Sequence, residues 1–142
     1  MLQLIIHIWA DFVLTQGTWI ALNKSKVTWA AALHALLYTC CFLVLTQSWQ
    51  ALLVIGVTHF LIDRFSLAKY LIFAKEWVLA PPGRLPKWEM CHVTGYYDQE
   101  CEHPRRPEYA DLKRPLWITV WLYIITDNLL HITINYLALT FL

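Results

Sequence analysis

Long stretches with almost no charge constrain the fold of this chain more than any other feature. The stretches 1–62 and 115–142 contain only four charged side chains: Asp11, Lys24, Lys26 and Asp127. Hydrophobic residues make up 58% of the chain, and its mean hydropathy is +0.46. Soluble domains contain about 45–50% apolar residues. Stretches this poor in charge are what a lipid solvent requires, so the sequence predicts a membrane protein.

Four apolar segments follow one another along the chain, separated by short polar turns or by a long polar loop. They cover residues 2–20, 27–46, 49–62 and 116–142, and the third continues as a more polar helix towards residue 80. Each is apolar throughout rather than at alternate positions, which indicates helices, because a helix satisfies its own backbone groups in lipid. We therefore expect an all-α fold: a single domain over residues 1–142, built as a bundle of about four transmembrane helices, with a polar loop at about 81–114.

The distribution of lysine and arginine predicts an orientation. Both the turn at 23–26 and the loop at 81–114 are basic, whereas the turn at 47–50 and the two termini carry neither residue. Because basic loops stay in the cytoplasm, we expect a multi-pass protein of the inner, cytoplasmic membrane with a cytoplasmic loop and both termini outside. The loop residues Cys91, His92, Cys101 and His103 match no strong zinc spacing, and their role stays open.

The overall charge limits the partners of the protein. The net charge is only +1, and no basic stripe is interleaved with aromatic residues, which excludes nucleic acid as a partner. Membrane lipid is the partner that the apolar segments predict. The oligomeric state cannot be inferred from these features.

Three carboxylates lie inside the apolar segments, and each has a histidine four residues away. The pairs are His7 with Asp11, His59 with Asp63, and Asp127 with His131. A spacing of four places both side chains of a pair on one face of a helix, about 6 Å apart. A further histidine, His34, lies in the second segment, so every predicted helix contributes to one polar set.

The order within the pairs changes with the direction of the helix. The first and third segments carry histidine before aspartate, whereas the fourth, which runs in the opposite direction, carries aspartate before histidine. This reversal places the three histidines in one layer and the three aspartates in another. Unrelated structural polar residues would not be expected to align in this way.

The cost of burying these carboxylates favours a metal site. An ionised aspartate at mid-bilayer costs on the order of 3 kcal/mol, and divalent cations compensate such charges better than histidine does. Nitrogen and carboxylate ligands suit zinc, manganese or iron rather than copper or calcium. We expect one or two such ions, held by a set of seven residues: His7, Asp11, His34, His59, Asp63, Asp127 and His131. A hydrogen-bonded network that only packs the helices is the alternative.

Other polar side chains accompany this set. Four amides are candidates for orienting the ligands from behind: Gln16, Asn23, Asn128 and Asn135. Arg64 follows Asp63 directly but faces another side of the helix. It is predicted either to bind an anionic head group or, the favoured interpretation, to extend towards the interface.

The residues of the His/Asp set resemble those of a family of small bacterial and phage inner-membrane proteins known only as a domain of unknown function. The matching stretches are HIWADFVLTQ, NKSK, LHALLY, THFLIDRF and TDNLLHITINYLAL, and LPKWEMCHVTGYY looks like a variant found in phage-associated members. The resemblance implies no activity of its own. A broader group of inner-membrane proteins with similar His/Asp motifs carries the label of metal-dependent hydrolases.

These features together predict a function. We expect metal-dependent hydrolysis of a membrane-embedded substrate such as a lipid or isoprenoid phosphoester, with the catalytic carboxylates drawn from Asp11, Asp63 and Asp127. Whether the protein is an enzyme stays open. The alternatives are an ion or proton transporter or relay, an intramembrane di-iron oxidase, and a non-enzymatic protein whose His/Asp layer fixes helix packing.

Overall fold

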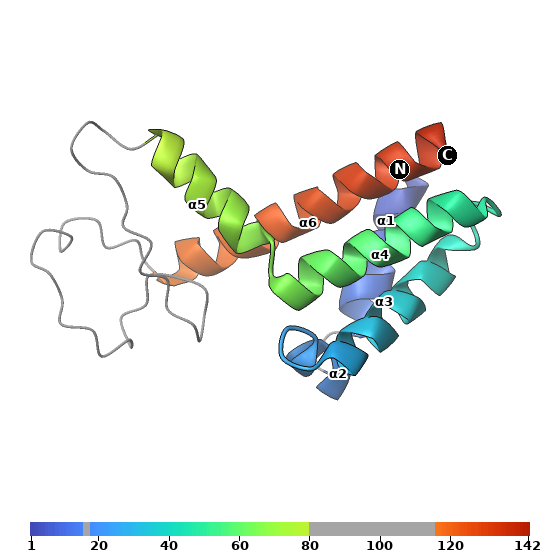
Figure 1. Cartoon of the computed structure of the whole chain (residues 1–142), viewed down its shortest axis with the longest axis horizontal. Coiled ribbons are helices and arrows are strands. Elements are labelled where there is room, and N and C mark those ends of the chain that lie inside the picture. The colour runs from blue at the N-terminus through green and yellow to red at the C-terminus, as the bar shows by residue number, and fades with distance from the viewer. Residues whose placement is uncertain (16–17, 80–115) are drawn as a thin grey trace, which may run out of the picture. The chain divides into compact units, whose positions relative to one another are not determined.

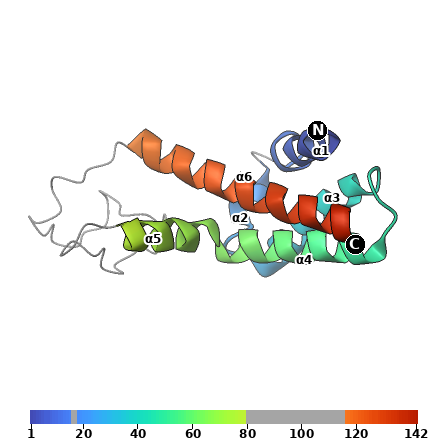
Figure 2. The same cartoon turned by 90° about the horizontal axis from the view of Figure 1, so that it is seen from above.

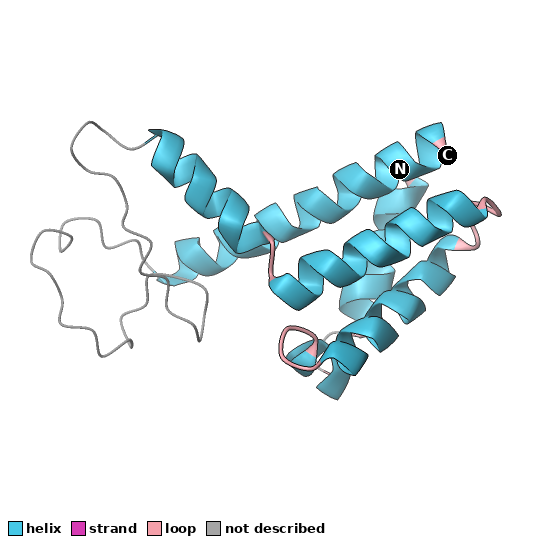
Figure 3. Ribbon diagram, viewed as in Figure 1, coloured by secondary structure: helices cyan, strands magenta, loops and turns pink. Residues whose placement is uncertain are grey.

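The computed structural model describes residues 1–15, 18–79 and 116–142. The helices are α1 (Leu2–Ile8), α2 (Trp19–Asn23), α3 (Thr28–Phe42), α4 (Trp49–Phe65), α5 (Ala68–Leu79) and α6 (Leu116–Phe141), and a π-helical segment, η1 (Trp9–Val13), continues α1 (Figure 1). No strand occurs within these ranges. Figure 3 shows the same helical character by colour. The prediction of an all-α fold is confirmed.

The described residues belong to two compact units. The first contains residues 1–67 and 127–142, and therefore α1 to α4 and the C-terminal part of α6. The second contains residues 68–126, and therefore α5 and the N-terminal part of α6. All residues of the predicted His/Asp set lie in the first unit, so the site can be described within that unit alone.

Local signals explain where the helices of the first unit begin and end. The Thr18 side chain caps α2 by accepting from Ala21 N at 3.3 Å, and the Ser48 side chain caps α4 by accepting from Ala51 N at 3.4 Å. Such caps satisfy amide groups that have no partner inside the helix. Ser66 ends α4 in the left-handed conformation, with φ at 50°. This stop places Asp63 in the last turn of α4.

Small residues allow α3 and α4 to approach closely. The two helices lie side by side in both views (Figures 1 and 2). Their buried positions include Ala31, Ala35 and Ala51. A Cβ atom at Gly56 would lie only 2.7 Å from Thr39 Oγ1, so any larger residue there would force the side chain of Thr39 to move. The close approach brings the polar residues of both helices together.

The core of the first unit consists of an apolar part and a polar part. The apolar cluster is Ala10, Tyr38, Phe42, Ile55 and Ala138. The residues of the predicted His/Asp set are mostly as buried as this cluster, with His34 and Asp63 only 0% and 5% exposed. Large aromatic side chains such as Trp29 and Trp49 are exposed and take no part in this core. The most buried space of this unit is therefore shared between apolar side chains and titratable ones.

The predicted localisation, a multi-pass protein of the inner membrane with both termini outside, is wrong. No helix within the described residues combines the length and the hydropathy of a membrane-crossing helix. α3 has 15 residues and α4 has 17, whereas a span needs about 20. α6 is longer, but four polar residues lower its hydropathy: Asp127, Asn128, His131 and Asn135. The same finding counts against the predicted transmembrane bundle.

The predicted segments differ from the observed helices mainly at their ends. The first segment, expected to be continuous over residues 2–20, is divided into α1, η1 and α2. The second, expected over residues 27–46, is shortened to α3 at Thr28–Phe42. The third covers all of residues 49–62, but its predicted continuation towards residue 80 is interrupted at Ser66, between α4 and α5. The predicted polar loop at 81–114 lies outside the described residues, as do Gln16 and the residues Cys91, His92, Cys101 and His103.

Candidate metal centre

The first part of the site comes from the junction between α1 and η1. Asp11 lies in the π-helical segment and is 7% exposed. The Thr15 hydroxyl donates to the carbonyl of Asp11 at 2.8 Å, which supports the backbone at the end of η1. π-Helical turns are frequent at functional sites because they redirect a side chain within a helix. Here the turn accompanies a carboxylate that points into the core.

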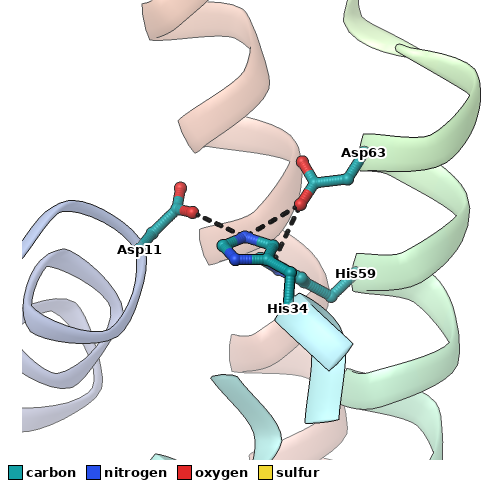
Figure 4. A group of neighbouring side chains, drawn as sticks. All are labelled: Asp11, His34, His59 and Asp63. Carbon is teal, nitrogen blue, oxygen red and sulfur yellow. Dashed lines mark hydrogen bonds and ion pairs between the residues drawn. The ribbon is translucent and has the colours of Figure 1, made fainter. Parts of the chain in front are cut away.

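Helices α3 and α4 supply the residues that face Asp11. His34 Nε2 lies 3.0 Å from Asp11 Oδ1 and 3.1 Å from Asp63 Oδ2 (Figure 4). His59, one helical turn before Asp63, places its Nε2 3.1 Å from the same Oδ2 atom. Two histidines and two carboxylates from three elements therefore converge at one point.

Helix α6 supplies the other side of the site. His131 Nε2 lies 3.6 Å from Asp63 Oδ1 and 3.8 Å from Asp127 Oδ2. Asp63 therefore turns one oxygen, Oδ2, towards His34 and His59, and the other, Oδ1, towards His131. Asp63 therefore contacts residues on both sides of the site.

These contacts define two groups of possible metal ligands. The first ligand group is Asp11, His34, His59 and Asp63, and the second ligand group is Asp63, Asp127 and His131. Within each group the ligand atoms lie within 4.8 Å of one another. Two atoms that bind one zinc ion at about 2.1 Å lie about 3.4 Å apart in a tetrahedral site. The observed separations of 3.0 to 3.8 Å lie around this value.

The alignment of these atoms bears on whether the cluster is a metal site or a hydrogen-bonded network. Four buried side-chain atoms have no aligned hydrogen-bond partner among the described residues: His34 Nδ1, His59 Nε2, Asp63 Oδ2 and His131 Nε2. Three of the four are ligand atoms of the two groups. The two histidine nitrogens lie 3.1 and 3.6 Å from the oxygens of Asp63, but none of the three atoms has an aligned hydrogen bond. Buried polar atoms are rarely left in this state unless something else, such as an ion, satisfies them.

His7 occupies a different place from the other histidines. Its Nδ1 lies 2.6 Å from Tyr38 Oη, and its Nε2 lies 2.9 Å from Asn128 Oδ1. Asn135 Nδ2 donates to Tyr38 Oη at 2.6 Å, so the hydroxyl proton is left to be donated to His7 Nδ1. His7 Nε2 then carries a proton and donates to Asn128. Both ring nitrogens of His7 are engaged, and it belongs to neither ligand group.

The four histidine rings nevertheless lie next to one another. The ring centroids of His34 and His59 are 4.9 Å apart, and those of His59 and His131 are 4.2 Å apart. The His7 ring lies 5.8 Å from that of His131. Tyr38 stacks on His59 with centroids 3.7 Å apart. The structure thus brings together histidines that the spacing argument placed in one layer.

Lys24 is part of the site, although the sequence argument used it only to predict orientation. Its Nζ lies 3.0 Å from Asp63 Oδ2, 3.5 Å from Asp11 Oδ1 and 3.3 Å from His34 Nε2. Its side chain is 21% exposed. The sequence did contain a signal for this role, because Lys24 is one of very few charged residues near the apolar segment that carries Asp11. The role of Tyr38 was not predicted, because nothing in its own segment shows that its hydroxyl makes buried hydrogen bonds.

Burial and ion pairing shift the pKa values of the charged members in opposite directions. Burial raises the pKa of Asp63, but its contacts with His131, His34 and His59 outweigh this effect and hold it well below the usual range. The pKa of Asp11 is lowered too, because contacts with His34 and Lys24 outweigh its burial. Burial lowers the pKa of Lys24, but Asp63 and Asp11 raise it above its ordinary value. Lys24 and both carboxylates are therefore charged near neutral pH.

The pKa values of His59, His34 and Asp127 shift in directions that depend on whether burial or a charged partner dominates. Burial lowers the pKa of His59 to about 4, so its ring is neutral at pH 7. Burial also lowers the pKa of His34, but contacts with Asp11 and Asp63 outweigh it and raise the net value. Burial raises the pKa of Asp127 to about 6. A neutral His59 can offer a lone pair to an ion, which a protonated one cannot.

The structure brings six of the seven predicted ligands into the two groups, leaving out His7. Among the predicted supporting amides, Asn128 and Asn135 contact His7 and Tyr38, whereas Asn23 donates to the Trp19 carbonyl of its own helix at 2.8 Å. Arg64 does not extend away from the unit. Its Nη1 donates to the Ser25 carbonyl at 2.7 Å, which fixes the turn that carries Lys24.

Comparisons with known proteins place part of this site in a family. Residues 1–82 match the family described as "Protein of unknown function (DUF3307)". The match includes the whole first ligand group, whereas Asp127 and His131 lie beyond it. No curated protein and no solved structure matches the chain. The relationships to phage proteins and to hydrolases are not confirmed and stay predictions. Because the match covers more than half of its length, the chain belongs to this family, DUF3307.

Proposed function

We propose that the buried His/Asp site binds a divalent transition metal ion and that the protein is a metal-dependent hydrolase. One observation supports the metal most directly. His59 Nε2, His131 Nε2 and Asp63 Oδ2 are buried and close together, yet they have no aligned hydrogen-bond partner among the described residues. A cation beside Asp63 Oδ2 would satisfy this oxygen together with the Nε2 atom of whichever histidine binds it.

The first ligand group is the better candidate for the ion. It offers two imidazole nitrogens and two carboxylate oxygens, whereas the second group offers one nitrogen and two carboxylates. Four ligands of this kind suit zinc, manganese or iron. His7 acts in this proposal as a support, because its hydrogen bonds to Tyr38 and Asn128 hold its ring beside His131.

The second ligand group supplies what hydrolysis needs besides the ion. Asp127 is the most exposed of the three carboxylates, at 13% against 8% for Asp11 and 2% for Asp63. It is therefore the one best placed to exchange protons with a substrate. The ion would polarise a water molecule. The water oxygen would attack the ester, its proton would pass to Asp127, and Asp127 would return a proton to the leaving oxygen.

A phosphoester is the substrate class that we favour. A bound cation neutralises the negative oxygens of a phosphoester, which a cluster of carboxylates alone would repel. The predicted lipid or isoprenoid nature of that ester concerns its apolar part. Nothing in the contacts of the first unit bears on it, and it stays a prediction.

Metal-dependent stability tests the proposal. We would strip the full chain with a chelator, add zinc or manganese, and compare melting curves of the parent and of Asp63→Asn. The parent should melt higher with the metal, because a ligand that binds only the folded state stabilises it, and Asp63→Asn should gain nothing. Hydrolysis of an aryl phosphate should depend on the same metal. A parent whose melting is unaffected by either ion would contradict the proposal.

A second candidate function rests on Lys24. Its ammonium group lies within ion-pair distance of both Asp11 and Asp63, so the first ligand group has a counter-charge even without a metal. The cluster would then only fix the packing of α3, α4 and the N-terminal segment. In that case the same melting experiment would show no response to metal, and Asp63→Asn would destabilise the protein equally with and without it.

A further inference from the structure

Lys24 lies where a metal ion would have to bind. Its Nζ contacts three of the four ligand atoms in the first ligand group: Asp63 Oδ2 at 3.0 Å, His34 Nε2 at 3.3 Å and Asp11 Oδ1 at 3.5 Å. An ion bound to the same atoms would lie about 2.1 Å from each of them. It would either overlap the ammonium group or lie next to it. Two positive charges in so small and so buried a space repel each other.

We propose that the Lys24 ammonium group is a tethered cation that occupies the first ligand group until a divalent metal ion displaces it. This inference rests on the proposed function, since it describes how the same site is filled. The lysine offsets one of the two carboxylate charges when no metal is present. Metal binding exchanges this charge of +1 for a charge of +2 and releases the side chain of Lys24.

The position of Lys24 suits such an exchange. Its side chain is the most exposed of the charged groups that meet here, at 21% against 8% for Asp11 and 2% for Asp63. It follows the last residue of α2, a helix of only five residues. The lysine therefore reaches the carboxylates from the solvent side and can withdraw in the same direction, without any rearrangement of α3 or α4.

Arg64 confines the movement to the side chain. Its Nη1 donates to the Ser25 carbonyl at 2.7 Å, and its Nε donates to Thr28 Oγ1 at 3.3 Å. These bonds fasten the turn after Lys24 to the end of α4. Asp63 and Arg64 are neighbours in the last turn of α4. The Asp63 carboxylate contacts Lys24, and the Arg64 guanidinium holds the backbone of the turn that carries Lys24. The turn stays in place while the ammonium group leaves.

Metal titrations of matched variants test the exchange. Zinc affinity of the full chain would be measured for the parent, for Lys24→Met and for Lys26→Met, an exposed lysine in the same turn. Methionine keeps much of the length of lysine and removes the charge. Lys24→Met should bind zinc at least about tenfold more tightly, because no ammonium group then competes for the ligand atoms, and a change of this size lies within the usual range for one charged group acting on the binding of another. Its metal-free form should melt lower than the parent, and Lys26→Met should behave as the parent does.

The possible outcomes separate this inference from the proposed function. Equal zinc affinity in the parent and in Lys24→Met would overturn the inference but leave the metal site standing. Weaker binding by Lys24→Met would show that the lysine is itself a ligand, which also overturns the exchange. If no zinc binds to the parent or to either variant, the proposed function fails and the inference fails with it.

A measurement on the parent protein avoids any fold defect of the variant. An amine-reactive reagent would be applied with and without saturating zinc, and modification of each lysine would be read by mass spectrometry. Displacement should make Lys24 react several-fold faster with zinc bound, whereas Lys26 serves as the internal control and should not change. A Lys24 reaction rate that is unchanged or slower with bound zinc would contradict the exchange.

Discussion

His59 Nδ1 lies 3.1 Å from His131 Nδ1, so the two rings share one proton between these atoms. If both rings are neutral, the ring that donates from Nδ1 has a bare lone pair on Nε2. The ring that accepts at Nδ1 must carry its own proton on Nε2. Only one of the two histidines can therefore offer its Nε2 to a metal ion while this hydrogen bond exists.

This relationship predicts one metal ion per chain rather than two. Ligation by His59 fills the first ligand group, and ligation by His131 fills the second, but the shared proton makes the two choices exclusive. Metal analysis after saturation and removal of excess zinc should give a stoichiometry near one. Two tightly bound ions per chain would mean that the hydrogen bond between the rings is lost on binding, and would contradict the prediction.

The two carboxylates Asp63 and Asp127 should differ in their effect on the metal. Asp63 contacts three histidines and Lys24, whereas Asp127 contacts His131 at 3.8 Å. Loss of a group that only orients a ligand costs about 10–100-fold in metal affinity, so loss of a central ligand should cost more than about 100-fold. Zinc titration against a competing chelator should show this loss for Asp63→Asn and a smaller one for Asp127→Asn. Equal losses would place the ion in the second ligand group.

Sequence patterns predicted the helical class and most of the site because both depend on local spacing. The pairs at positions i and i+4 in α1/η1, α4 and α6 needed no tertiary information, since a helix places such residues on one face. His34 was assigned to the site because it is a histidine inside an apolar segment. These patterns also led to the incorrect membrane localisation, because an apolar segment does not show where its helix begins and ends.

Residue spacing within one helix does not predict which distant segments come into contact. Tyr38 meets His7 across 31 positions, and Lys24 meets Asp63 across a turn, two helices and their connection. The π-helical turn at Asp11 depends on a change of hydrogen-bond register that no residue type marks. His7 was expected to be a ligand, but its role depends on partners that only the folded chain brings together.

Asp127 should make the metal-free protein less stable as the pH rises through about 6. Its pKa is raised by burial from 3.8 to about 6, so the folded state favours the protonated form. The associated stability is fully present below about pH 4 and is lost as the pH rises through 6, and it amounts to about 3 kcal/mol. The Asp127→Asn variant cannot ionise at this position, so its stability should not fall in this pH range for this reason.

Denaturant unfolding of both proteins from pH 4 to pH 8, in the presence of a chelator, checks this expectation. The advantage of Asp127→Asn over the parent should grow between pH 4 and pH 6 and stay constant above pH 7. Titration of the histidines is common to both proteins and largely cancels in the difference. An advantage that does not change with pH would show that the charge of Asp127 is already compensated in the folded state.

Tyr38→Phe should separate the stability of the polar core from metal binding. The Tyr38 hydroxyl contacts His7 Nδ1 and accepts from Asn135 Nδ2, both at 2.6 Å and both in the buried interior. Its removal leaves two buried polar groups without this partner, at a cost of about 1–3 kcal/mol for each. The phenyl ring can still stack on His59, where the rings are 3.7 Å apart, so zinc affinity should change little.

The matched control for this prediction is Tyr136→Phe. Tyr136 lies in the same unit but is 57% exposed, and surface substitutions of this kind usually change stability by less than about 0.5 kcal/mol. Thermal melting and zinc titration of both variants would be compared with the parent. Tyr38→Phe should melt clearly lower than Tyr136→Phe, while all three proteins bind zinc alike. If Tyr38→Phe instead kept its melting temperature and lost zinc binding, Tyr38 would belong to the metal site and His7 would act through it as a positioning residue rather than as a support for the fold.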